Sequence, residues 1–231
     1  MKRKIAALCM LICLLSGMAV WLNAEADAPV TYNAEDIFEQ GGQTVLYIRV
    51  LREDDSLKAT GTGVVLSPDG LAATAYHVVK GAERIEGMLP DGRVISRIEV
   101  LAYDEQTDAA IVRLPAPDDG KKGAYAYLPV REPAVRYGEN VFAIGYPMAN
   151  TPIITEGIVN SPRAEVNGRS RILTSAQIAS GMSGGPVIDR YGRVAGIISG
   201  SLRTMNNIHL VIGMDDIRML LDAHKITLEA S

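Results

Sequence analysis

The sequence has almost no cysteine and little histidine, and neither residue is placed where thiol or metal chemistry would need it. The two cysteines, Cys9 and Cys13, lie in the first two dozen residues, so the rest of the chain has no thiol and can form no disulfide. The three histidines are far apart, and none belongs to the H-x-x-x-H spacing of a helical zinc site. Cysteine chemistry is excluded, and we expect no metal site and no other cofactor.

A cluster of positive charge is also missing after residue 4. The chain has 23 Lys and Arg against 27 Asp and Glu, and removal of residues 1–28 leaves a net charge of about −5. Nucleic-acid binding needs concentrated positive charge that neutralises phosphates. We therefore expect proteins or peptides as partners, and no nucleic acid.

The N-terminus has the pattern of an export signal. Three basic residues at positions 2–4 precede an uncharged run from Ile5 to Leu22, and alanines at positions 24, 26 and 28 have A-x-A spacing. This pattern favours a signal peptide over residues 1–28. The alternative is an uncleaved membrane anchor, because a run of this length can span a bilayer. In both cases the working domain, residues 29–231, is expected outside the cytoplasm: periplasmic or secreted, or anchored to the inner membrane.

Short apolar runs broken by turn signals make up the rest of the chain. They occur at 44–51, 61–67, 71–75, 94–103, 109–115, 140–146, 152–161, 171–176, 193–200 and 208–213. Sequences such as Ser67-Pro68-Asp69-Gly70 separate these runs and predict tight turns. Only two helices are expected, near 34–40 and 214–224. The pattern predicts an all-β fold of antiparallel strands, divided at the loop-like segment 116–123 into two barrels at about 34–116 and 124–213.

The glycine-rich stretch ASGMSGGPV, residues 179–187, contains a candidate nucleophile. A serine hydroxyl becomes a good nucleophile when a neighbouring imidazole accepts its proton and a third group orients that imidazole. Ser183 stands in Gly-x-Ser-Gly-Gly, His77 ends one predicted strand, and Asp108 precedes another. Each residue alone also has an ordinary structural interpretation. Because all three occur in the order His, Asp, Ser, each in a fitting local sequence, we expect them to form a catalytic triad.

Other residues of the same types have structural interpretations. Asp104 is the nearest rival of Asp108 but lacks the Thr-Asp-Ala-Ala context. His209 lies in an alternating strand, His224 lies at a helix end, and Ser180 is most simply a turn residue. We expect none of these four side chains to take part in catalysis.

From about residue 34 to 224 the sequence resembles the trypsin-like serine proteases of the bacterial HtrA (Deg) type. The resemblance rests on GTGVVLSPDGLAATAYHVV, TDAAIVRL, FAIGYP, EGIVNS and GMSGGPVIDRYGRVAGI, which follow that family's order and spacing. It implies two six-stranded antiparallel β-barrels of the chymotrypsin-like kind, with the site between them and a helix at the C-terminus. The implied function is a serine endopeptidase that cleaves extended or unfolded polypeptides, as in protein quality control. The alternative is an inactive module on this fold that binds peptides or a protein partner.

By the same resemblance, the backbone N–H groups of Gly181 and Ser183 form an oxyanion hole. Met182 departs from the family pattern, which usually has Asn or Asp before the nucleophile. A thioether cannot pair with a newly cut N-terminal amine, so activation by N-terminal cleavage is not expected. A loop that is ordered only by substrate or by an effector stays open as an alternative.

The resemblance also implies where substrate binds. A peptide would add as a strand to the backbone of Ser199, Gly200 and Ser201. Gln177 and Ile178 would line an apolar specificity pocket, which predicts cleavage after aliphatic residues in preference to Lys or Arg.

Proteins of this type usually carry one or two PDZ domains after the protease domain. Here 31 residues follow Gly200, and a predicted strand and helix use them, so no PDZ domain is expected in this sequence. Trimers built through the N-terminal segment are common in the family. The sequence neither supports nor opposes a trimer.

Overall fold

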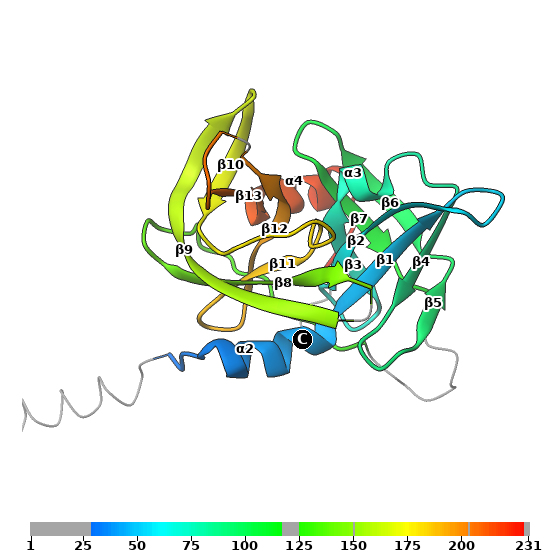
Figure 1. The fold of residues 1–231 in the computed structure, drawn as a ribbon, viewed down its shortest axis with the longest axis horizontal. Coiled ribbons are helices and arrows are strands. Elements are labelled where there is room, and N and C mark those ends of the chain that lie inside the picture. The colour runs from blue at the N-terminus through cyan, green and yellow to red at the C-terminus, as the bar shows by residue number, and fades with distance from the viewer. Residues whose placement is uncertain (1–28, 117–124, 150, 203, 229–231) are drawn as a thin grey trace, which may run out of the picture. The chain divides into compact units, whose positions relative to one another are not determined.

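The apolar runs of the sequence form antiparallel strands joined mostly by short turns (Figure 1). The computed structural model describes residues 29–116, 125–149, 151–202 and 204–228. The expected leader (1–28) and nearly all of the expected connecting loop (116–123) lie outside these residues. The elements below all belong to one unit, Tyr32–Ser231.

The strands are β1 (Val45–Leu51), β2 (Leu57–Val65), β3 (Leu71–Ala75), β4 (Arg84–Met88), β5 (Val94–Ser96), β6 (Glu99–Asp104), β7 (Ala109–Arg113), β8 (Asn140–Met148), β9 (Thr151–Val166), β10 (Arg169–Thr174), β11 (Pro186–Asp189), β12 (Val194–Ser201) and β13 (His209–Gly213). The helices are α2 (Ala34–Gly41), the short 3-10 helix η1 (Gly42–Thr44), α3 (Tyr76–Val79) and α4 (Met214–Ala223). In the described part of the chain no helix is long and apolar enough to cross a bilayer.

Two antiparallel sheets form the two halves of this unit. The first seven strands are ordered β5-β4-β1-β2-β3-β7-β6, and the other six close into a barrel ordered β10-β13-β12-β11-β8-β9. A backbone hydrogen bond of 3.3 Å joins Ile98, just before β6 at one end of the first sheet, to Ile85 in β4, the second strand from the other end. The all-β, chymotrypsin-like fold with a C-terminal helix is confirmed, although the first half is a curled sheet of seven strands.

The run 94–103, predicted as one strand, is two strands. Arg97 lies between β5 and β6 with a φ of 63°, a left-handed angle that interrupts an extended ladder. The interruption lets β5 pair with β4 while β6 pairs with β7. One residue in an uncommon conformation therefore sends the chain to the other end of the sheet.

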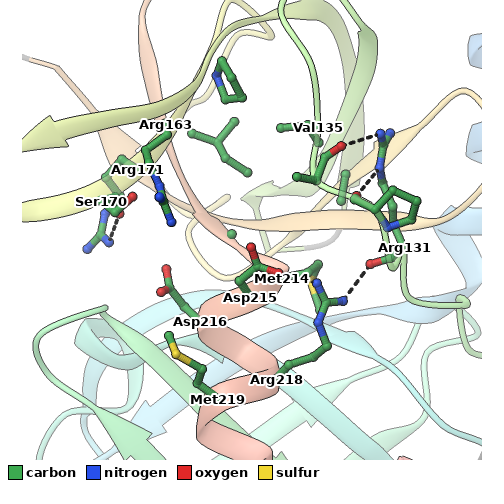
Figure 2. A pocket seen from close by; sticks show the side chains of 16 residues that line it. Arg131, Val135, Arg163, Ser170, Arg171, Met214, Asp215, Asp216, Arg218 and Met219 are labelled. Atoms are coloured by element: carbon green, nitrogen blue, oxygen red, sulfur yellow. Dashed lines mark hydrogen bonds and ion pairs between the residues drawn. The ribbon is translucent and has the colours of Figure 1, made fainter.

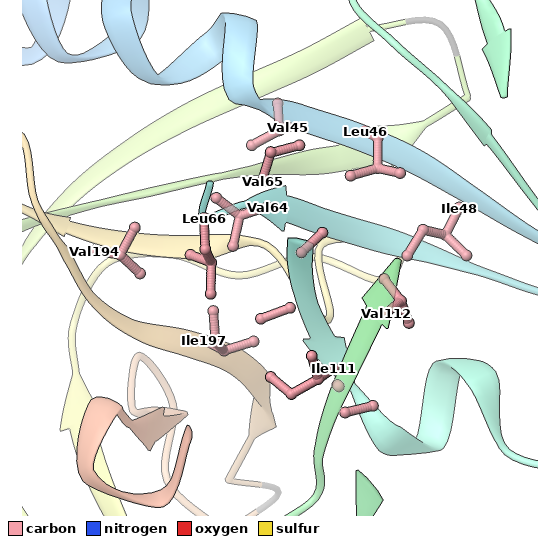
Figure 3. Packing of buried hydrophobic residues seen from close by; sticks show 14 of the residues in the cluster. Val45, Leu46, Ile48, Val64, Val65, Leu66, Ile111, Val112, Val194 and Ile197 are labelled. Carbon is pink, nitrogen blue, oxygen red and sulfur yellow. The ribbon is translucent and has the colours of Figure 1, made fainter. Parts of the chain in front are cut away.

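Buried apolar side chains hold the two halves together. The larger cluster packs Val64 and Ile111 of the first sheet with Val194 and Ile197 of the barrel (Figure 3). A smaller cluster fills the barrel interior. Each fully buried aliphatic side chain contributes about 1.5 to 3 kcal/mol, so the shared cluster stabilises the packing of one half on the other.

Candidate active site

Strand pairing places the imidazole beside the carboxylate. His77 lies in α3, directly after β3, and Asp108 directly precedes β7; these strands pair with Ala75 opposite Ala109. His77 Nδ1 is 2.9 Å from Asp108 Oδ2 and 3.1 Å from Oδ1. The backbone N–H of His77 also donates to Oδ1, at 3.0 Å. The carboxylate thus orients both the ring and the turn that carries it.

Asp108 is buried and held in an uncommon backbone conformation. Its side chain is 9% exposed, whereas that of His77 is 48% exposed. Its φ is 64°, and strained angles of this kind tend to occur at functional sites. Burial acts to raise the pKa of Asp108, but hydrogen bonds from His77 and Ser199 and the charge of His77 outweigh it and hold that pKa below its usual value. Asp108 is therefore a stable anion next to the imidazole.

Ser199 links the carboxylate to the nucleophile. Its hydroxyl donates to Asp108 Oδ2 at 2.6 Å, and its backbone carbonyl accepts a hydrogen bond of 3.4 Å from Ser183 Oγ. Among the described residues, Ser183 Oγ makes no hydrogen bond to His77. The three expected triad residues are thus linked through Ser199, with the Ser183 hydroxyl bonded to the Ser199 carbonyl.

The loop before Ser183 has two backbone donors without partners. A turn closes from the Met182 N–H to the Ala179 carbonyl at 3.1 Å, and Gly181 takes a φ of 93° in it. A Cβ on Gly181 would lie 2.4 Å from the Tyr146 carbonyl oxygen, so only glycine fits. The N–H groups of Gly181 and Ser183 make no hydrogen bond within the described part of the chain. Two free donors beside a hydroxyl are what a developing oxyanion requires.

The model of the family described as trypsin-like peptidase domain matches residues 61–197 of this sequence. The chain belongs to this family. The matched segment contains all three residues of the expected triad. It also contains the whole loop around Ser183 and the first part of β12, and it ends at Ile197, two residues before Ser199.

Relatives of this trypsin-like peptidase domain carry HtrA and Do names. It is 32% identical over 178 residues to Protease Do-like 1, chloroplastic, of Arabidopsis thaliana, covering 70% of this chain and 39% of the relative. It is 32% identical over 199 residues to Serine protease HTRA2, mitochondrial, of Bos taurus, covering 80% and 42%. The resemblance to the HtrA type is thereby confirmed, and the chain spans about two fifths of the length of these relatives.

A solved structure shares the fold of this trypsin-like peptidase domain. The serine endoprotease from Yersinia pestis matches with a TM-score of 0.71 and 22% sequence identity. The match covers 84% of this chain and 67% of the other. At this identity the likeness shows the fold.

Met182 anchors the loop 179–185 of this domain from inside the barrel. Its side chain is fully buried in the smaller core, and its sulfur accepts a hydrogen bond of 3.3 Å from the Ala179 N–H. Gly145 lies against it so closely that a Cβ there would be 2.9 Å from the Met182 Cα. Apolar packing thus fixes the residue directly before Ser183.

Thr62 connects the loop 179–185 to the first sheet, a role that the sequence did not indicate. Its buried hydroxyl donates to the Gly181 carbonyl at 2.8 Å and accepts from the Tyr146 N–H at 2.9 Å. The Thr62 N–H also donates to the Ser183 carbonyl, at 2.8 Å. No local pattern could reveal this contact, because its partner lies 119 residues away.

Replacement of Thr62 by valine should loosen this loop. The buried Tyr146 N–H loses its partner, which costs about 1 to 3 kcal/mol in the free energy of unfolding. Urea unfolding should show that loss, and kcat should fall because the Gly181 carbonyl is released. Thr62→Ser keeps the hydroxyl and serves as the matched control. Equal stability and activity of the valine and serine variants would contradict this role.

The expected substrate residues lie on and near one free strand edge. β11 pairs with β12 only as far as Ile197, so Ser199–Ser201 keep one side without a partner strand in the described structure. The Gln177 side chain donates to Asn207 Oδ1 at 3.2 Å, and Ile178 packs partly buried against the smaller core. The roles of Gln177, Ile178 and Ser199–Ser201 in substrate binding stay predictions.

Three of the residues expected to be structural lie apart from the hydrogen bonds of His77, Asp108 and Ser183. Asp104 accepts hydrogen bonds from its own turn, at Gln106 and Thr107. His209 is buried with Nδ1 2.7 Å from the Ser201 hydroxyl, and burial lowers its pKa. His224 follows the last turn of α4 and is exposed. In the described ranges no group of three or more His, Cys, Asp or Glu side chains could hold a metal ion.

Proposed function

We propose that this chain is a serine endopeptidase that cleaves extended or unfolded polypeptides. The observation that carries the proposal is the bonded His77–Asp108 pair, which Ser199 links to Ser183; the Ser183 loop has two backbone N–H groups without a partner among the described residues. Family membership and the names of the relatives support it.

The first chemical step forms an acyl-enzyme. His77 takes the proton of the Ser183 hydroxyl as Oγ bonds to the scissile carbonyl carbon, and the carbonyl electrons move to its oxygen. The N–H groups of Gly181 and Ser183 donate to that oxyanion, while buried Asp108 stabilises the imidazolium. His77 then protonates the leaving amine, and water repeats the sequence to release the acid. Ser183 Oγ must leave the Ser199 carbonyl to begin, and catalytic hydrogen bonds often form only in the substrate complex.

Labelling with a fluorophosphonate tests this function directly. The folded protein should form a covalent adduct at Ser183, identified by mass spectrometry of the labelled peptide, and should cleave casein. Denatured protein is the control, because it keeps the hydroxyl and loses the imidazole beside it. Binding of unfolded peptides without labelling or cleavage would instead identify an inactive binding module.

We also propose that the domain acts outside the cytoplasm, by virtue of the basic and uncharged pattern of residues 1–22. N-terminal sequencing of protein from the extracytoplasmic fraction should find a start between Glu25 and Pro29. A variant with Leu14→Arg and Leu15→Arg should stay in the cytoplasm, because two charges interrupt the apolar run. Full-length wild-type protein in the membrane fraction would indicate the anchor, and its recovery as soluble cytoplasmic protein would contradict export.

A further inference from the structure

A cavity with an unusual charge lies beside Ser199. It has a volume of about 270 Å³, and its walls come from the β9–β10 hairpin, β12 and β13. Its lining residues are Val166, Asn167, Arg169, Arg171, Ser199 and Leu210. Two of these six residues are arginines and none is acidic, although the whole chain has an excess of acids.

Arg171 is a buried cation without an acidic partner. The residue is 4% exposed, and the only side-chain hydrogen bond that it makes in the described structure goes from Nη1 to the neighbouring Ser170 carbonyl, at 2.8 Å. Burial lowers its pKa, which shows that its charged form is poorly solvated there. Buried charges are normally paired, so the remaining guanidinium donors lack the anion that such a site calls for.

The acids around Arg171 do not supply that anion. Asp108, Asp216 and Asp104 act on its charge, yet none of the three forms an ion pair with it among the described residues. The Asp108 carboxylate is already bonded to His77 and Ser199. Asp216 lies across a second cavity of about 190 Å³, on α4, and Figure 2 shows it there with Asp215, opposite Arg163 and Arg171 on β9 and β10.

Arg169 adds a second positive charge to the cavity that Arg171 lines. Residues two apart in a strand point to the same face, and β9 and β10 pair regularly from Arg169 to Arg171. Arg169 forms no ion pair in the described part of the chain. Val166 and Leu210 supply apolar surface in the same cavity, which suits the methylene groups of a longer side chain.

Ser199 connects this cavity to the substrate path. It is the first residue of the free edge Ser199–Ser201 and also part of the cavity wall. A peptide paired with that edge passes the cavity within a few residues of its cleaved bond. We propose that the cavity is a subsite for an acidic substrate side chain, Glu or Asp, bound by Arg169 and Arg171. This inference rests on the proposed endopeptidase function.

Matched peptides that differ by Glu or Gln at one position test the subsite. The position is scanned over the four residues before the cleaved bond and the two after it, and kcat/KM is measured for each pair. At one position Glu should be preferred by roughly tenfold or more, because hydrogen bonds to charged groups are the strong ones. Arg169→Gln and Arg171→Gln should bring that ratio close to one. Arg163→Gln, which alters only the second cavity, is the matched control and should keep it.

Reversal of the charge at Arg169 gives a test that an unfolded variant could not pass, because it predicts a new preference and not merely a loss. Arg169→Glu changes a side chain that is not fully buried and should shift the preference at that position from Glu to Lys. Ratios near one at every position, or a ratio that Arg169→Gln and Arg171→Gln leave unchanged, would overturn the subsite. Stimulation or inhibition of the Gln peptides by inorganic phosphate, lost in the arginine variants and without any Glu preference, would show a free-anion site and also overturn it. If no peptide is cleaved and the fluorophosphonate does not label the protein, the endopeptidase function is overturned as well. If labelling is normal and the Gln peptides are cleaved, only the subsite is overturned.

Discussion

Replacement of Ser183 by alanine should lower kcat for casein or peptide hydrolysis by roughly 10⁴-fold or more. The Ser183 hydroxyl is the group that forms the acyl bond in the proposed mechanism, and alanine cannot replace it. Fluorophosphonate labelling should disappear in the same variant. The alanine variant should unfold at nearly the wild-type urea concentration, because the hydroxyl makes only one long hydrogen bond, to the Ser199 carbonyl.

Ser180→Ala is the matched control for this experiment. Ser180 lies three residues earlier in the same turn and is exposed, and its hydroxyl makes no hydrogen bond within the described residues. The Ser180→Ala variant should keep both fluorophosphonate labelling and hydrolytic activity. Undiminished hydrolysis in Ser183→Ala would rule out the serine mechanism, and equal losses in both variants would indicate that the loop had merely been disturbed.

Replacement of Asp108 by asparagine should lower kcat by about 10⁴-fold, because an amide favours the wrong tautomer of His77. Asp104→Asn, four residues earlier, should have little effect on kcat, since Asp104 bonds only its own turn. Steady-state kinetics at neutral pH gives the kcat of both variants. Circular dichroism checks that each variant is folded. Asparagine at position 108 with near wild-type kcat would show that another group orients the imidazole.

The same variant should change how stability depends on pH. The pKa of Asp108 is lowered in the folded protein, so the carboxylate stabilises the fold above its unfolded pKa of about 3.9. That contribution is lost as the pH falls through the lowered folded value. Between pH 7 and pH 3 the free energy of unfolding should therefore fall less in Asp108→Asn than in the wild type. Parallel curves for the two proteins would contradict the assigned shift.

Local patterns in the sequence predicted most strands and the residues at the centre of the site. Alternation and turn residues indicated the strands, and short motifs marked His77, Asp108 and Ser183. The break at Arg97 could not be seen, because a left-handed angle in a non-glycine residue has no sequence signature. β4 was missed for another reason: it has only two buried residues, one of them a glycine, and so lacks a clear apolar alternation.

Contacts between distant segments were beyond the reach of such patterns. Ser199 was predicted to hold substrate, but its hydroxyl bonds to Asp108, 91 residues earlier. Thr62 was not predicted at all, and its partners lie 84 and 119 residues away. The charge of the Arg169 and Arg171 cavity likewise appears only when the β9–β10 hairpin is placed beside β12. Each of these depends on the docking of two elements, which a single stretch of residues does not encode.

The bonds from Thr62 to Gly181 and from Ser199 to Asp108 can form only after both halves of the domain have been synthesised. Both cross from the first-made half of the chain to the second. A nascent chain that has emerged only as far as the first sheet has a histidine and an aspartate, but neither nucleophile nor donors. The proposed catalytic residues come together only when synthesis has passed residue 199 and the barrel has packed against the first sheet. A chain that has been synthesised only as far as the first sheet therefore lacks both the proposed nucleophile and the proposed oxyanion donors.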